Sequence, residues 1–90
     1  MSPAERKALK ARAHALDPII HLGGKGLTES VIAEIGRALD AHELIKVRAG
    51  SMERDERATA FTEICTRLAA QPVQHIGKVL VIYRPKPEAS

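Results

Sequence analysis

Apolar residues recur at the spacing of an amphipathic helix near the start of this sequence, over residues 3 to about 16. Three features mark where this helix begins: Ser2 as the N-cap, Pro3 at the first helical position, and Glu5 placed to close a capping box. The apolar stripe of the helix consists of Leu9, Ala13 and Leu16. We therefore predict an N-terminal helix that buries one side and presents the other to solvent or a partner.

Two further segments repeat this periodicity. Thr28 is the predicted N-cap of a helix that reaches about Ala41. Ser51 is the predicted N-cap of the next helix, which ends before Pro72 and has carboxylates in its first turn, where they interact favourably with the helix dipole. The predicted buried positions are Val31, Ile32, Ile35 and Leu39 in the first of these helices, and Ala58, Phe61, Ile64, Cys65 and Leu68 in the second.

Four short segments have the composition or the alternation of β-strands. Residues 19–22 form a short run that glycines end, and residues 44–49 alternate between two faces. Residues 73–76 and 79–84 flank Gly77-Lys78, a two-residue turn that begins with glycine, as a type II′ hairpin requires. The last segment is apolar on both faces, which predicts a strand in the interior of a sheet.

The predicted fold class follows from the order of these elements. A helix between consecutive strands implies a parallel crossover, and the final hairpin adds an antiparallel pair. We predict an α/β (α+β two-layer) fold in which an N-terminal helix precedes β-α-β-α-β-β, with a four-stranded mixed sheet. A chain of 90 residues has room for one domain, so we assign residues 1–85 to it and residues 86–90 to a short flexible tail.

The net charge of +3 is unevenly distributed, with +3 in residues 1–26, −2 in residues 27–70 and +2 in residues 71–90. If the two ends of the chain meet in space, they form a basic patch that attracts polyanions; if they do not, the excess is solvated surface. One cysteine, no apolar stretch at the start and no apolar run of roughly 20 residues together predict a cytoplasmic protein without membrane contact.

The loop Gly23-Gly24-Lys25-Gly26 is the main candidate site, because its G-x-x-G spacing stands between a predicted strand and a predicted helix. Glycine lets a ligand approach the backbone closely, and the free N–H groups at the start of the helix favour an anion. Phosphate is the natural ligand, and the arrangement resembles the clamp of KH domains. The alternative is an ordinary strand-to-helix turn in which glycine is only sterically convenient.

Other chemistries lack the residues that they need. The loop is not a P-loop, because Gly26 stands where Ser or Thr would bind magnesium. The four histidines have no i,i+4 partner and no neighbouring cysteine, and Cys65 lies on a buried stripe where a thiol is inert. Two aromatic residues, Phe61 and Tyr83, are too few for a base-stacking platform. We expect no catalytic activity, no metal, no cofactor and no small-molecule substrate.

Four motifs in order resemble the YhbY family, the bacterial single-domain relatives of the CRM domain, which is named for chloroplast RNA splicing and ribosome maturation. These motifs are Leu16-Asp17-Pro18, Gly23-Gly24-Lys25-Gly26-Leu27-Thr28, His42-Glu43-Leu44-Ile45-Lys46-Val47, and Ile76-Gly77-Lys78 with Tyr83-Arg84-Pro85. The resemblance extends from about Lys7 to Pro85. It implies a fold similar to the C-terminal domain of bacterial translation initiation factor 3, with strand order one, two, four, three and an antiparallel last strand.

The resemblance also implies a function. A family member would be a monomeric, non-catalytic protein that binds structured ribosomal RNA in precursors of the large ribosomal subunit and assists the assembly of that subunit. The RNA-contacting loop of the family corresponds to Gly23–Gly26, followed by Thr28. The basic surface of the family corresponds to Arg6, Lys7, Lys10, Lys46, Arg48 and Arg84. The alternative function is a protein-interaction module that docks on a ribosomal protein or an assembly factor.

Overall fold

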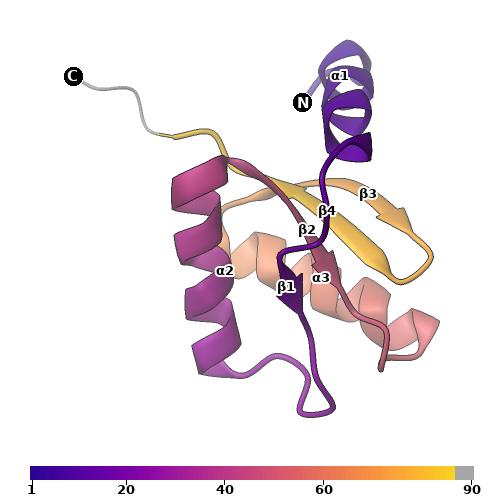
Figure 1. Ribbon diagram of the computed structural model, residues 1–90, viewed down its shortest axis with the longest axis vertical. Coiled ribbons are helices and arrows are strands. Elements are labelled where there is room, and N and C mark those ends of the chain that lie inside the picture. Colours follow the sequence, from indigo (N-terminus) through magenta and orange to yellow (C-terminus); the bar gives the residue numbers. More distant parts are fainter. Residues whose placement is uncertain (87–90) are drawn as a thin grey trace.

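Helices and strands follow one another along the chain in the predicted order. In the computed structural model, which describes residues 1–86, an N-terminal helix precedes a β-α-β-α-β-β arrangement (Figure 1). The helices are α1 (Pro3–His14), α2 (Glu29–His42) and α3 (Arg54–Leu68), and the strands are β1 (Ile20–His21), β2 (Leu44–Arg48), β3 (Gln71–Ile76) and β4 (Val79–Tyr83). The predicted fold class is thereby confirmed.

The strands lie in the sheet in the order β1-β2-β4-β3, which the family resemblance implied. β1 and β2 are parallel, with α2 as their connection, whereas β4 is antiparallel to both β2 and β3. β4 is the interior strand that its two apolar faces predicted. Leu80 and Ile82 enter the core beneath α2 and α3, while Val81 packs in a separate cluster with α1.

The main core lies between the sheet and the pair α2 and α3. Side chains alternate along β2, so Ile45 and Val47 enter this core while Lys46 and Arg48 belong to the opposite face. The two helices contribute most of the residues that their periodicity predicted, and those with no exposed surface are Ile35, Leu39 and Ile64. The prediction that Ala58 is buried was wrong: it is exposed, and Ala60, one turn before Ile64, is buried on that side of the helix instead. The register of β2 therefore places its basic side chains away from both of these helices.

Helix α1 covers only one end of the opposite face of the sheet (Figure 1). The predicted capping box is present: Ser2 Oγ accepts from the Glu5 N–H at 3.1 Å, and the Glu5 carboxylate accepts from the Ser2 N–H at 3.3 Å. Leu9 and Ala13 are buried as predicted. Leu16 is 39 % exposed, because the helix ends at His14, ahead of the Asp17-Pro18 break. Its assignment to the buried stripe was wrong.

The predicted start of the third helix was also wrong. Helix α3 begins at Arg54 with Glu53 as its N-cap residue, and the Glu53 N–H donates to the Glu56 carboxylate at 3.0 Å. Ser51 lies in the preceding loop, where its hydroxyl donates to the Leu22 carbonyl at 3.2 Å. The hydroxyl that suggested a cap therefore joins the loop after β2 to the end of β1.

Strand β3 begins earlier than predicted and includes Pro72. This is possible because β3 is at the edge of the sheet, where a missing N–H breaks no ladder bond, and the pairing with β4 is irregular between Pro72 and Gln74. Gly77 has a φ of +54° and Lys78 is not among the residues with positive φ, as the predicted type II′ turn requires.

The chain after β4 remains close to the start of β2. The Arg84 N–H donates to the Glu43 carbonyl at 2.9 Å, and the Lys86 N–H donates to the Glu43 carboxylate at 2.7 Å. Residues 87–90 of the predicted 86–90 tail lie outside the described residues.

Candidate nucleic-acid interface

The 23–26 loop is a tight turn between β1 and α2, at the end of the molecule opposite α1 (Figure 1). The Gly26 N–H donates to the Gly23 carbonyl at 3.0 Å, which closes a four-residue β-turn. Gly26 has a φ of +68°, and a Cβ on it would lie 3.4 Å from Met52 Cε. The positive φ therefore favours glycine at position 26, and a methyl group there would also contact the end of the Met52 side chain.

Gly23 and Gly24 differ from Gly26 in this respect. Neither has a positive φ, and a Cβ built on either residue would meet no heavy atom within 4 Å in the described part of the chain. Both residues are exposed. The turn itself therefore does not need glycine at these two positions, which weakens the purely steric explanation of the G-x-x-G spacing and leaves close approach of a ligand as the alternative.

The loop leads directly into the N-terminus of α2. Thr28 is the N-cap as predicted, and its Oγ1 accepts from the Val31 N–H at 3.1 Å. The hydroxyl of Thr28 thus has a structural partner, and any contact with RNA adds to its capping role. The partial positive charge of the helix N-terminus is aligned with the loop, where it favours an anion.

The carboxylate nearest this helix start is paired. Arg67 on α3 donates to both carboxylate oxygens of Glu29, at 2.6 and 2.9 Å. This guanidinium holds the pKa of Glu29 below its usual value, and the carboxylate in turn raises the pKa of Arg67. Pairing with Arg67 offsets the negative charge of Glu29, so this carboxylate repels a phosphate at the loop less than a free one would.

A second basic region lies on the part of the sheet that α1 leaves uncovered, and we call it the open sheet face. Cross-strand register aligns His21 with Arg48 and Arg48 with Val79, so these residues share that face. Lys46 lies on the same face because it is two residues before Arg48 in β2, and its Nζ donates to the Leu16 carbonyl at 2.8 Å. The open sheet face consists of His21, Lys46, Arg48, Ile76, Lys78 and Val79.

Lys78 belongs to this surface although its sequence position did not suggest it. A Cβ on Gly50 would lie 3.8 Å from Arg48 Nε and 3.8 Å from Lys78 Cδ, so the two basic side chains flank one point on the surface. The Ala49 N–H also donates to the Lys78 carbonyl at 2.7 Å. The predicted hairpin turn placed Lys78 beside a strand end, but only the pairing of β2 with β4 shows that this end adjoins Arg48.

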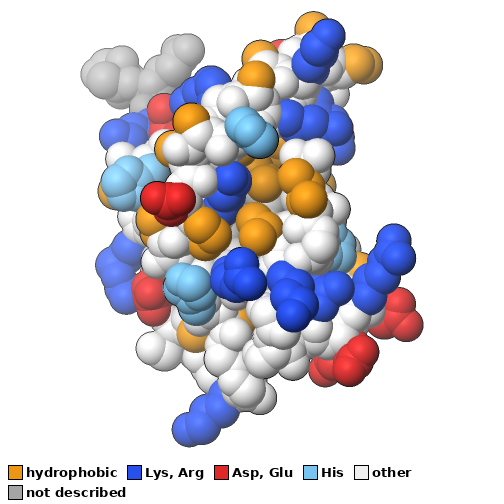
Figure 2. Space-filling model, turned by 45° about the vertical axis from the view of Figure 1, so that its right-hand side comes forward, with side chains coloured by type: hydrophobic (Ala, Val, Ile, Leu, Met, Phe, Trp, Pro, Cys, Tyr) orange, Lys and Arg blue, Asp and Glu red, His pale blue; other side chains and the backbone are white. Residues whose placement is uncertain are grey.

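The basic residues of α1 do not meet the loop. Arg6, Lys7 and Lys10 are exposed on the helix at one end of a molecule that is 38 Å long, and the loop lies at the other end. Figure 2 shows Lys and Arg side chains near α1 at the top and a further group across the middle, with apolar side chains between them. The open sheet face therefore lies between the basic residues of α1 and the 23–26 loop.

Comparison with known proteins assigns the chain to a family. A family model for the CRS1 / YhbY (CRM) domain matches residues 1–84. The chain belongs to this family. A Haemophilus influenzae relative named "RNA-binding protein" is 45% identical over 89 residues, with 99% of this chain and 90% of the relative covered. A Pseudomonas aeruginosa relative named "Probable RNA-binding protein" is 40% identical over 88 residues, with coverage of 98% and 85%.

A solved structure also resembles this CRM domain. The solution structure of a hypothetical protein from Staphylococcus aureus superposes with a TM-score of 0.85 at 30% sequence identity, and the match covers 100% of this chain and 94% of that one. The fold and the family assignment therefore rest on independent comparisons of sequence and of structure.

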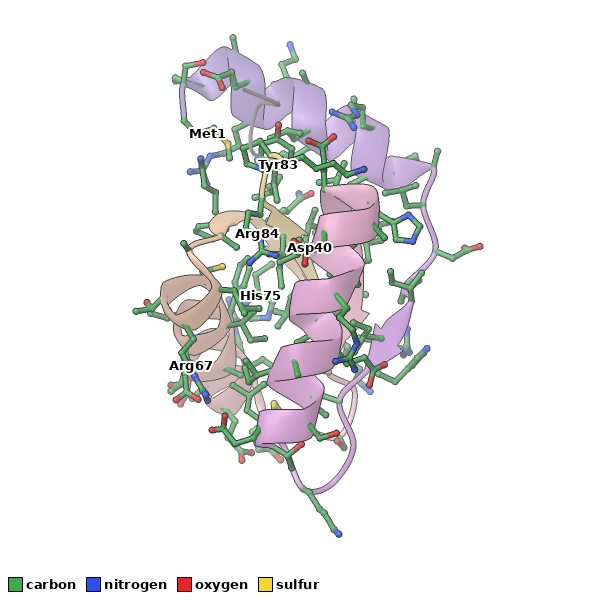
Figure 3. All side chains as sticks on the ribbon, turned by 90° about the vertical axis from the view of Figure 1, so that its left-hand side faces the viewer. Met1, Asp40, Arg67, His75, Tyr83 and Arg84 are labelled. Carbon is green, nitrogen blue, oxygen red and sulfur yellow. The ribbon has the colours of Figure 1, made fainter. Side chains whose placement is uncertain are left out.

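Arg84, which the sequence predicted to be part of the basic surface, has partners inside this CRM domain. Its guanidinium donates to the carbonyls of Leu68 and Gly36 at 2.9 and 3.0 Å and to the Asp40 carboxylate at 2.7 Å. Figure 3 shows Arg84 and Asp40 pointing toward one another beside α2. The side chain is 24 % exposed, so we leave Arg84 out of the proposed RNA surface.

Three other sequence observations concern metal binding, the thiol of Cys65 and membrane crossing. Within residues 1–86, no group of three or more His, Cys, Asp or Glu side chains is arranged to hold a metal ion. Cys65 is buried, and burial raises the pKa of its thiol to about 11, so the thiol is protonated at neutral pH. No described helix combines the length and apolarity that crossing a membrane requires.

Proposed function

We propose that this chain is a non-catalytic protein that binds structured ribosomal RNA through the 23–26 loop and the adjacent open sheet face, and that it assists assembly of the large ribosomal subunit. The observation that carries the proposal is the pair Gly23 and Gly24, exposed glycines whose presence neither backbone conformation nor packing explains. Bare backbone at a helix N-terminus, beside Lys25, suits a phosphate group. Membership of the CRM family and the names of the relatives support RNA as the partner.

The open sheet face supports the same partner. It presents basic side chains next to exposed apolar ones, and Ile76 is 52 % exposed. RNA backbone neutralises the charges, while aliphatic surface can contact sugars and splayed bases. With so few aromatic residues, affinity must come from backbone contacts and RNA shape. The resemblance to YhbY proteins directs the proposal to ribosomal RNA and to precursors of the large subunit.

The test of this proposal reverses the charge of the 23–26 loop at two exposed positions and leaves the core residues unchanged. The double variant Gly24→Asp/Lys25→Asp should weaken binding to a structured ribosomal RNA fragment, because carboxylates repel phosphate. Ala33→Asp/Arg37→Asp makes the same change of charge on exposed positions of α2 and is the matched control. Thermal melting followed by circular dichroism checks that both variants fold. If the folded loop variant binds as tightly as the parent, the proposed role of the loop is wrong.

The protein-interaction alternative rests on one observation. A hollow of about 480 Å³ lies between the end of α1 and the start of β2, with apolar Leu16, Ile19 and Leu44 in its lining. Ile19 is 48 % exposed and Leu16 is 39 % exposed, so two large apolar side chains next to each other in this lining are accessible to a partner. The dependence of binding affinity on salt concentration distinguishes RNA binding from protein docking. RNA binding should weaken with a log–log slope of about −0.7 to −0.9 per phosphate contacted, whereas apolar docking should change little.

Crosslinking in cells followed by sequencing of the attached RNA tests the ribosomal target directly. Recovery of large-subunit ribosomal RNA is the expected result. Recovery of messenger RNA alone would contradict the ribosomal part of the proposal and leave RNA binding in place.

A further inference from the structure

A small basic hollow lies between the start of α3 and the turn that joins β3 to β4. It has a volume of about 300 Å³ and is lined by Arg54, Arg57, His75 and Gly77. Figure 1 shows the two elements side by side at the right of the molecule, away from the 23–26 loop at the lower end. Two arginines and an imidazole from separate elements thus converge on one concave site.

Arg57, which lines the hollow, has a buried N–H group, at Nε, without a hydrogen-bond partner among the described residues. One end of its guanidinium, Nη1, donates to the Met52 carbonyl and so fixes the side chain. Its Nε is buried and has no hydrogen-bond acceptor among the described residues. A buried donor without an acceptor is unfavourable, and an anionic oxygen bound at Arg57 would supply the acceptor.

Three carboxylates, Glu53, Asp55 and Glu56, are close to the two arginines in sequence but do not pair with them directly. Within residues 1–86, neither Arg54 nor Arg57 takes part in an ion pair. Asp55 and Glu56, their neighbours in sequence, line a different hollow that also includes Leu27.

His75 is held at the rim by packing. Its ring meets Phe61 edge-on, with centroids 6.1 Å apart and an interplanar angle of 76°. His75 pairs with Leu80 in the sheet, which puts its side chain on the α3 side. A fixed imidazole N–H can donate to an oxygen at the position where the arginines converge.

The hollow, on the α3 side of the sheet, is next to the open sheet face at the turn between β3 and β4. Gly77 in its lining precedes Lys78, and Lys78 lies beside Arg48 at Gly50. We propose that this hollow binds a phosphodiester of the RNA backbone, as a second phosphate site in addition to the 23–26 loop. The inference rests on the proposed RNA-binding function and adds to it a path, from the loop across Arg48 and Lys78 to the start of α3.

The test measures RNA affinity across about 50 to 200 mM salt for single glutamine variants. Arg54→Gln removes an exposed side chain and should keep the fold, whereas Arg57→Gln also removes the bond to Met52. Arg54→Gln should bind severalfold more weakly, with a log–log slope shallower by up to about 0.9. Arg37→Gln, which removes one exposed charge on α2, is the control and should match the parent.

A second measurement needs no mutation. In the parent protein, the Arg57 Nε–H resonance should shift in the NMR spectrum as the RNA is added, because that group gains an acceptor. An unmoved resonance at saturating RNA, or a parental affinity and slope for folded Arg54→Gln, would overturn the second site. If the parent protein itself binds RNA without dependence on salt, or not at all, the proposed function fails instead.

Discussion

The guanidinium of Arg84, at the end of β4, lies 2.7 Å from the carboxylate of Asp40 on α2. The same side chain donates to main-chain carbonyls of Gly36 on α2 and Leu68 on α3. One arginine therefore joins both core helices to the sheet. The family resemblance assigned Arg84 to the RNA-binding surface, but its guanidinium donates to acceptors within the fold.

Replacing Arg84 with lysine separates these two roles. Arg84→Lys keeps the positive charge but cannot reach three acceptors with one ammonium group, so it should lower the free energy of unfolding by about 1 to 3 kcal/mol. Urea unfolding measures this loss. RNA affinity, measured where the variant is folded, should equal that of the parent. A stable Arg84→Lys with weakened RNA binding would contradict the structural role and return Arg84 to the RNA surface.

The glycines of the loop should respond to alanine in opposite ways. Gly26→Ala forces a left-handed conformation and crowds Met52, so it should destabilise the fold by about 1 kcal/mol or more. Gly23→Ala/Gly24→Ala should leave stability unchanged or raise it by up to about 1 kcal/mol, because it restricts only the unfolded chain. That double variant should nevertheless bind RNA severalfold more weakly. Parental RNA affinity in it would support the turn explanation.

Lys46 has both a structural contact and a position on the open sheet face. Its Nζ donates to the Leu16 carbonyl at 2.8 Å, and this exposed bond should contribute less than about 1 kcal/mol to stability. Lys46→Met keeps the length of the side chain and removes the charge. We expect weaker RNA binding with a salt slope shallower by about 0.7 to 0.9, and a nearly unchanged melting temperature. The reverse pattern would show that Lys46 only holds the segment after α1.

Cys65 gives a prediction that depends on pH. Burial raises the pKa of its thiol from the ordinary 9.0 to about 11, so the native state holds this proton more tightly than the unfolded chain. The stability that this provides is fully present below the unfolded pKa and is lost as pH rises through about 11.

Comparison of the parent with Cys65→Ala isolates that contribution from other titrating groups. The difference in unfolding free energy should be constant below about pH 8 and should shrink toward pH 11, by no more than about 1.4 kcal/mol per pH unit. Urea unfolding across this range is the measurement. A difference that stays constant to pH 11 would mean that the folded thiol is accessible to water.

Local features of the sequence predicted most of the fold. The capping box between Ser2 and Glu5, the Thr28 cap and the glycine at the start of the hairpin turn involve residues within three positions of one another. Apolar residues on both faces of β4 indicated an interior strand, because only burial on both sides accounts for them. These interactions are decided by sequence neighbours, so the sequence contains what is needed to predict them.

The roles of the polar side chains were decided by tertiary structure. Ser51 resembled a cap, but its hydroxyl found the Leu22 carbonyl, 29 positions away in the sequence. Arg48 ends β2 and Arg84 directly follows β4, yet register leaves Arg48 on the open sheet face, while Arg84 meets Asp40, 44 positions away. Hydrogen bonds and ion pairs act over a few ångströms, so the nearest acceptor depends on how distant segments pack.

The sequence by itself determined the element order, most of the core residues and the presence of a G-x-x-G loop before a helix. Tertiary structure decided that the basic residues of α1 lie at the far end from that loop, that Lys78 joins Arg48, and that Gly23 and Gly24 are glycines without a steric need. Apolar periodicity and helix capping involve residues that are close in sequence, so the elements that depend on them can be predicted from the sequence. Surface charge and free space around a residue depend on contacts between segments, which exist only after folding.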